Sequence, residues 1–188
     1  MNNKVLWGIG AFVAVILLAI FWYIGTYNSL IKINEEVNNK WAQVETQYQR
    51  RVDLIPNLVE TVKGYASHEK DVFENVTKAR SALMNAKDVG QVQEANNMLT
   101  GALKSLFAVA EAYPELRAQE GFLNLQKELS DTEDKIAYSR QFYNSVVREY
   151  NSTLVVFPNN LMANMMGFAA EKFFEAQESE KVPVKVDF

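Results

Sequence analysis

Side chains that could bind a metal ion or act as nucleophiles are scarce in this sequence. It has no cysteine, and its single histidine is His68, next to Glu69. A di-iron site in a helical bundle needs carboxylates from four helices and two Glu-x-x-His pairs, which one histidine cannot supply. No Gly-x-Ser-x-Gly turn or phosphate-binding loop occurs either. We therefore expect His68 to be a surface or capping residue, and we expect no metal, no cofactor and no covalent catalysis.

Paired carboxylates are the remaining route to acid–base chemistry. Glu128 and Glu133 lie close together in the sequence, and two carboxylates can exchange protons with a substrate. Charged residues at such positions more often form the solvated face of a helix. This interpretation predicts no catalytic residues and no enzyme activity.

A charged cluster surrounds a proline in the first third of the chain. It consists of Arg50, Arg51 and Asp53, followed by Pro56 and Asn57. One interpretation is a corner that binds an anionic partner or a lipid headgroup. The other is that one arginine pairs with Asp53 or with a carboxylate of the last long helix and fixes a turn. We favour the second, because both signs of charge occur beside apolar neighbours.

A Tyr-Asn dipeptide occurs three times. The copies are Tyr27-Asn28, Tyr143-Asn144 and Tyr150-Asn151. The last two are one heptad apart, so their side chains share a helix face. A ladder of Tyr and Asn hydrogen bonds would form a polar groove for a partner helix. Alternatively, the tyrosines straddle the helix seam with their hydroxyls in water, which is the arrangement we favour.

The elements that must position these residues are helices. Apolar residues recur at steps of three, four and seven, which is typical of amphipathic helices. In the first helix they are Leu30, Val37, Trp41, Val44 and Tyr48. Similar patterns predict helices over residues 27–51, 56–86, 91–113 and 115–154. The apolar stripe of the second helix includes Tyr65, and that of the fourth includes Leu123. Short connections favour antiparallel neighbours. The expected fold is all-α, with an elongated antiparallel up-and-down four-helix bundle over residues 26–156.

Pro56 marks the expected end of the first bundle helix. Proline cannot donate a helical hydrogen bond, and its ring clashes with the carbonyl four residues earlier. Asp53 is a suitable N-cap for a second helix, with Pro56 in the first turn. We predict a chain reversal here; a kinked continuous helix is the alternative, since no glycine opens the turn.

The N-terminus carries a run without formal charge that begins at Val5 and ends at Ile24. About twenty apolar residues are enough to cross a bilayer as a helix. A cleaved signal peptide would have a shorter apolar core and a small-residue cleavage site, whereas this run ends in bulky aromatics that suit a membrane interface. We predict a single-pass protein of the inner or plasma membrane, with residues 1–4 as a flank and residues 5–25 as the transmembrane helix. The Lys and Arg flanking the run favour a cytoplasmic soluble domain by a narrow margin.

Composition limits the class of partner. The net charge is −4, and both signs are mixed along the chain. A nucleic-acid-binding protein concentrates basic residues on one face, so no nucleic-acid partner is expected. About 160 residues follow the apolar run, which is enough for one domain with a core.

Residues 157–188 form a C-terminal apolar segment and an extended tail. The stretch LMANMMGF is rich in methionine, a side chain that adapts to irregular apolar surfaces. It could dock on the membrane surface or on a partner, or it could cover the end of the bundle. Phe173 and Phe174 are expected to pack on the bundle, and the final VPVKVDF fits a lone strand or an extended arm.

Several blocks of this sequence, taken in order, resemble those of one family. They are YNSL, RRVDLIPNLVETVKGYASHE, YPEL, FLNLQKELSDTEDKIAYSRQFYNSVVREYN, FPNNL and KFFEA. Together they cover residues 27–176, and their order and spacing resemble the LemA family of bacterial membrane proteins. The resemblance implies an N-terminal membrane helix followed by a four-helix bundle, and no enzyme activity, cofactor or catalytic residue. The methionine-rich stretch and the acidic tail depart from the family pattern.

The favoured function is protein–protein interaction by a membrane-anchored helical bundle, as a scaffold, an adaptor or a homo-oligomeric assembly. The expected partners are the lipid bilayer, further copies of the chain and an unknown membrane protein. Small residues at Gly8, Gly10 and Ala14 allow close approach of membrane helices. The alternative is an envelope- or lipid-binding module that uses the Met/Phe-rich C-terminal segment, and an enzyme that uses carboxylates is the third hypothesis.

Overall fold

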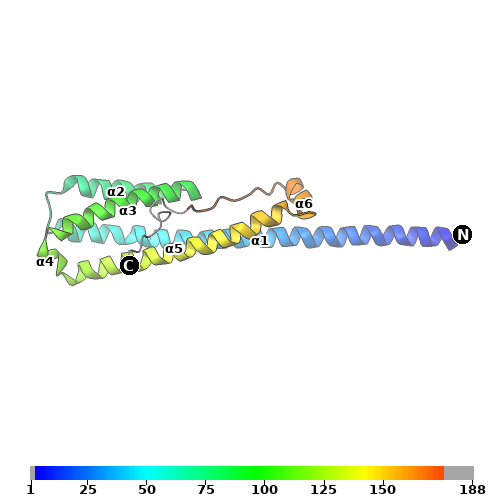
Figure 1. The fold of residues 1–188 in the computed structure, drawn as a ribbon, viewed down its shortest axis with the longest axis horizontal. Coiled ribbons are helices and arrows are strands. Elements are labelled where there is room, and N and C mark those ends of the chain that lie inside the picture. The colour runs from blue at the N-terminus through cyan, green and yellow to red at the C-terminus, as the bar shows by residue number, and fades with distance from the viewer. Residues whose placement is uncertain (1–2, 176–188) are drawn as a thin grey trace, which may run out of the picture. The chain divides into compact units, whose positions relative to one another are not determined.

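The structure is a computed structural model that describes residues 3–175, all of whose regular elements are helices (Figure 1). They are α1 (Asn3–Lys63), α2 (Lys70–Asn85), α3 (Val89–Glu111), α4 (Pro114–Arg117), α5 (Glu120–Val155) and α6 (Asn159–Met166). The predicted all-α class is confirmed. The strand or arm expected for VPVKVDF lies outside the described residues.

The chain divides into two compact units. Among the described residues, the first comprises 3–40 together with Ser145–Glu171, and the second comprises Trp41–Asn144 together with 172–175. The division falls inside α1 and α5, so each of these long helices contributes to both units.

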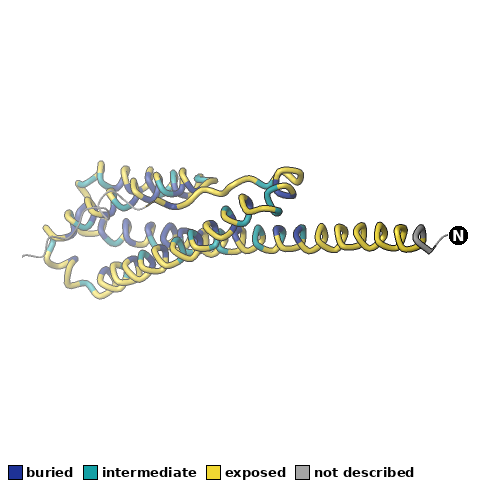
Figure 2. The backbone as a smooth tube through the Cα atoms, turned by 45° about the vertical axis from the view of Figure 1, so that its right-hand side comes forward, coloured by how far each residue is buried: buried dark blue, intermediate teal, exposed yellow. Residues whose placement is uncertain are grey.

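The second unit is an up-and-down arrangement of four helices. The C-terminal part of α1, then α2, α3 and the N-terminal part of α5 alternate in direction, and α2 lies beside α3 (Figure 1). Its core consists of the apolar stripes read from the sequence, and Figure 2 shows this buried face along each helix. Fully or nearly fully buried members include Val44, Leu58, Val76, Leu99 and Ile136.

The predicted reversal at Pro56 is wrong, because α1 continues through this residue to Lys63. Pro56 has no N–H, so the carbonyl of Val52 loses its helical partner. Arg80 of α2 replaces that partner: its Nε donates to the Val52 oxygen at 3.1 Å. A side chain from a neighbouring helix therefore satisfies the group that the proline leaves free. Asp53 does not cap a helix but accepts a hydrogen bond from Gln49, one turn earlier in α1.

The first reversal of the bundle lies instead at residues 64–69, inside the stretch expected to be helical. At the C-terminal end of α1, the N–H groups of Gly64 and Ala66 donate hydrogen bonds to the carbonyls of Glu60 and Val62, respectively. His68 is exposed in this turn. Tyr65, which was expected in the apolar stripe, is also exposed because the helix ends before it.

The fourth predicted helix, over residues 115–154, is interrupted. The short α4 ends at Arg117 and α5 begins at Glu120. Between them the side chain of Gln119 accepts the N–H of Phe122 at 2.6 Å and caps the start of α5. The break changes which residues face the core: Phe122 is buried, whereas Leu123, expected inside, is exposed.

The first unit contains the apolar end of the chain. Every residue from Leu6 to Gly25 is exposed, and burial along α1 begins at Thr26 and Leu30 (Figure 2). By length and composition this part of α1 is a candidate membrane span. The seam prediction is confirmed at Leu30 and Val37, which are buried in this unit.

Candidate functional site

The most developed recognition site among the described residues is a groove in the second unit that holds the extended segment Lys172, Phe173, Phe174 and Glu175. We call it the Phe174 groove. The side chain of Phe174 is 4% exposed. Its ring lies against Trp41 of α1, with ring centroids 5.9 Å apart, and against Tyr143 of α5, at 5.4 Å. Such stacked and edge-on arrangements are favourable for aromatic pairs.

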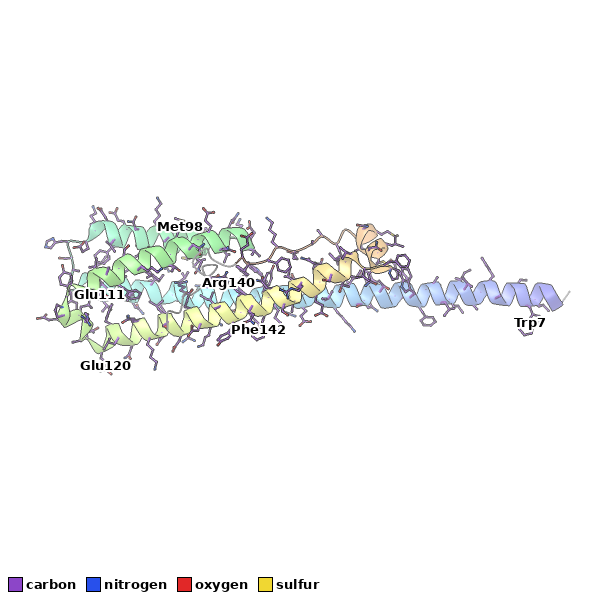
Figure 3. The ribbon with its side chains drawn as sticks, viewed as in Figure 1. Trp7, Met98, Glu111, Glu120, Arg140 and Phe142 are labelled. Carbon is purple, nitrogen blue, oxygen red and sulfur yellow. The ribbon has the colours of Figure 1, made fainter. Side chains whose placement is uncertain are left out.

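Arg140 completes the enclosure of the ring. Its guanidinium carbon lies 5.1 Å from the Phe174 ring centroid, within cation–π range. The same side chain donates from Nη2 to the backbone oxygen of Glu175 at 2.8 Å. Arg140 and Phe142 extend from different sides of α5 (Figure 3), so Arg140 points to the groove while Phe142 stays exposed.

The backbone of the segment is bound as closely as its aromatic ring. Asn144 accepts the N–H of Phe174 at 2.9 Å and donates to its carbonyl at 2.8 Å. Tyr143 donates its hydroxyl to the carbonyl of Lys172 at 3.1 Å, and Gln93 of α3 accepts the N–H of Glu175 at 2.9 Å. With Arg140, five side-chain hydrogen bonds bind the backbone of this short segment.

These contacts define what the groove can recognise. Main-chain bonds accept any extended sequence, and a pocket for one side chain supplies selectivity. Phe173 is 42% exposed, so the groove selects mainly at the position of Phe174. A cavity of about 650 Å³ lies beside the segment. It is lined by Phe173 and by α3 residues such as Gly90 and Asn97, so the segment is open on the side that faces α3.

The first unit holds the preceding residue of the chain in the same way. Asn151 of α5 donates to the carbonyl of Glu171 and accepts its N–H, both at 2.9 Å. Tyr150 is buried in this unit. The asparagines of Tyr143-Asn144 and Tyr150-Asn151 therefore do form hydrogen bonds, but the bound group is the chain's own extended segment. The expectation that their tyrosine hydroxyls lie in water is wrong for Tyr143, whose hydroxyl donates to a backbone oxygen.

The charged cluster around Arg51 forms a separate, largely structural site. Arg51 is 5% exposed, and its Nη1 lies 2.6 Å from Glu133 Oε2 on α5. It also donates to Asn96 and Thr100 of α3. Burial lowers the pKa of Arg51, and the nearby Glu133 carboxylate opposes this effect. The guanidinium thus joins α1, α3 and α5.

The other members of that predicted corner do not converge with Arg51. Arg50 is exposed and lies 3.9 Å from Glu128, a surface ion pair of small energetic value. Pro56 and Asn57 are exposed on α1. Both carboxylates considered for acid–base chemistry therefore face arginines of α1. Within residues 3–175, no group of three or more acidic or histidine side chains could hold a metal ion.

Fold and site together describe an all-helical protein with a candidate membrane span and a bundle that binds an extended segment of its own chain. The LemA family model matches residues 40–188, and the chain belongs to this family. Protein LemA of Metamycoplasma hominis is 28% identical over 178 residues, which cover 92% of this chain and 80% of the relative.

More distant relatives carry a different name. Magnetosome protein MamQ 2 of Paramagnetospirillum magneticum is 24% identical over 200 residues, which cover 93% of this chain and 71% of the relative. Magnetosome protein MamQ of Magnetospirillum gryphiswaldense is 23% identical over 184 residues, which cover 84% and 68% of the two chains.

Proposed function

We propose that this protein is a single-pass membrane protein that acts by protein–protein interaction, with no catalytic step of its own. The observation that carries the proposal is the Phe174 groove, which binds five backbone groups and one aromatic ring of an extended segment. Such a surface is suited to recognising a peptide. The chain belongs to the LemA family, as the sequence blocks predicted, and this membership supports a membrane-associated helical protein.

The partner we propose is a second copy of the chain. The groove already fits residues 172–175, so the same residues of another copy fit it with identical contacts. Residues 168–175 form no regular element, and such a connection can bind in its own groove or in that of a neighbour. A shared membrane raises the local concentration of copies and favours exchange between them.

The anchor sets where this assembly forms. We propose that α1 crosses the inner or plasma membrane once, and that the bundle faces the cytoplasm, as the flanking Lys and Arg favour. Because the chain has no cysteine, one cysteine introduced near the C-terminus can be labelled selectively. Labelling only after the membrane is made permeable is the result expected for a cytoplasmic bundle; labelling in intact cells would contradict this orientation.

Co-purification of two differently tagged copies from one membrane tests the assembly. The wild-type copies should co-purify after detergent extraction. Phe174→Ala in both copies should reduce the recovered partner severalfold, because it empties the aromatic pocket. Phe173→Ala is the matched control, since this neighbouring ring is half-exposed and should leave recovery unchanged. Equal recovery for both variants, or recovery of a different membrane protein in place of the second copy, would contradict the proposed exchange.

A further inference from the structure

The first unit carries an exposed apolar surface in a part of the chain that has no charge. Residues 150–170 contain no Asp, Glu, Lys, Arg or His. The large apolar side chains exposed there are Val155, Val156, Phe157, Leu161, Met165 and Met166. Met162 and Ala163 of α6 are buried and hold the helix on its unit. Helix α6 therefore packs on its unit through one face and exposes apolar side chains on the other.

The position of this surface along α1 is informative. Helix α6 lies beside α1 in both Figure 1 and Figure 2, and Figure 2 shows that the fully exposed stretch of α1 gives way to buried residues near this point. The buried side begins at Thr26, and α6 belongs to the same compact unit as this part of α1. Trp22 and Tyr23 lie at the same end of the exposed stretch, and these aromatic types are enriched at membrane–water interfaces.

We infer that α6 and the α5–α6 connection form an interfacial foot, which lies in the headgroup region of the bilayer that α1 spans. A short apolar element at this depth gains free energy by removing its exposed side chains from water. The occupant of the surface is lipid, because the surface adjoins a stretch that lipid must already cover. Without lysine or arginine in residues 150–170, the foot does not depend on anionic headgroups.

The inference rests on the membrane anchoring proposed above, so its test must separate the two. The full-length protein is reconstituted in phosphatidylcholine vesicles with a polarity-sensitive fluorophore on one introduced cysteine. Phe157→Cys and Met165→Cys probe the foot. Leu18→Cys probes the proposed span, and Tyr138→Cys probes an exposed position of the second unit.

The foot predicts blue-shifted emission at positions 157 and 165. It also predicts that doxyl groups on the lipid chains quench these two labels severalfold more than the label at position 138. Addition of phosphatidylglycerol should leave the quenching unchanged. The label at position 18 should be quenched in every preparation if the anchor spans the bilayer.

Three results would overturn the foot while the label at position 18 is quenched. In the first, aqueous iodide quenches positions 157 and 165 as strongly as position 138. In the second, both positions are protected from iodide and from lipid doxyl groups, which means that protein covers the surface. In the third, quenching requires an anionic lipid. Failure of quenching at position 18 would instead contradict the anchor itself.

Discussion

Tyr48 is a buried residue of α1 whose hydroxyl has no hydrogen-bond partner among the described residues. Burial raises its pKa to about 12 from the usual 10.0, although the nearby Arg140 acts in the opposite direction. A buried hydroxyl without a partner costs free energy on folding. The ring of Tyr48 is nevertheless buried in the core of the bundle, so the unfavourable free energy comes from the hydroxyl group and not from the ring.

Tyr48→Phe should therefore leave the free energy of unfolding at neutral pH unchanged or raise it. The folded state keeps the Tyr48 proton to a higher pH than the unfolded state does. Titration of Tyr48 therefore leaves the stability of the wild type unchanged below pH 10 and lowers it by up to about 3 kcal/mol as pH rises towards about 12. Denaturant titrations of both proteins in detergent, from neutral to alkaline pH, should show a steeper alkaline loss for the wild type. A loss of more than about 1 kcal/mol at neutral pH in the variant would contradict this account.

The residue types of the Phe174 groove show what a sequence can and cannot indicate. The repeated Tyr-Asn dipeptide drew attention to Tyr143 and Asn144 because a heptad places the copies on one helix face. Gln93 gave no such signal, since its partner Glu175 is 82 positions away. Arg140 gave no signal either, because only the folded chain brings the Phe174 ring close to its guanidinium.

At the scale of elements, apolar periodicity was sufficient to predict helices but not their ends. The ends depend on single hydrogen bonds that periodicity does not contain. Pro56 stays inside α1 because a residue of another helix binds the free carbonyl of Val52. The break before α5 depends on one glutamine side chain, and it moves Phe122 into the core position expected for Leu123.

The role of Arg80 can be tested with a double-mutant cycle. Arg80→Ala in the wild type leaves the Val52 carbonyl without a partner and should lower the free energy of unfolding by about 1–2 kcal/mol. In a Pro56→Ala background the residue at position 56 supplies the missing N–H, so the same substitution should cost clearly less. Thermal or denaturant unfolding of the four proteins gives the coupling energy. Equal costs in both backgrounds would show that Arg80 does not compensate for the proline.

At the scale of the whole molecule, the chain carries two surfaces with different proposed partners. The apolar start of α1 is the candidate membrane span, and the proposed foot adds a second lipid contact in the same unit. The Phe174 groove lies in the other unit and binds peptide backbone. A protein built this way needs no chemical centre to act, because its proposed task is to bring copies together at a membrane.

The most direct test of this claim is a cross-link between two copies. One copy carries Gln93→Cys and the other Glu175→Cys, since the native side chain and backbone of these residues are hydrogen-bonded. The two are co-expressed with different tags and treated in membranes with a short bismaleimide. Exchange predicts a cross-linked dimer that carries both tags, and its loss when Phe174→Ala is added to the second copy. A chain with both cysteines should also cross-link internally. If internal cross-links form readily but no dimer with both tags is found, the groove binds only its own chain and the central claim is wrong.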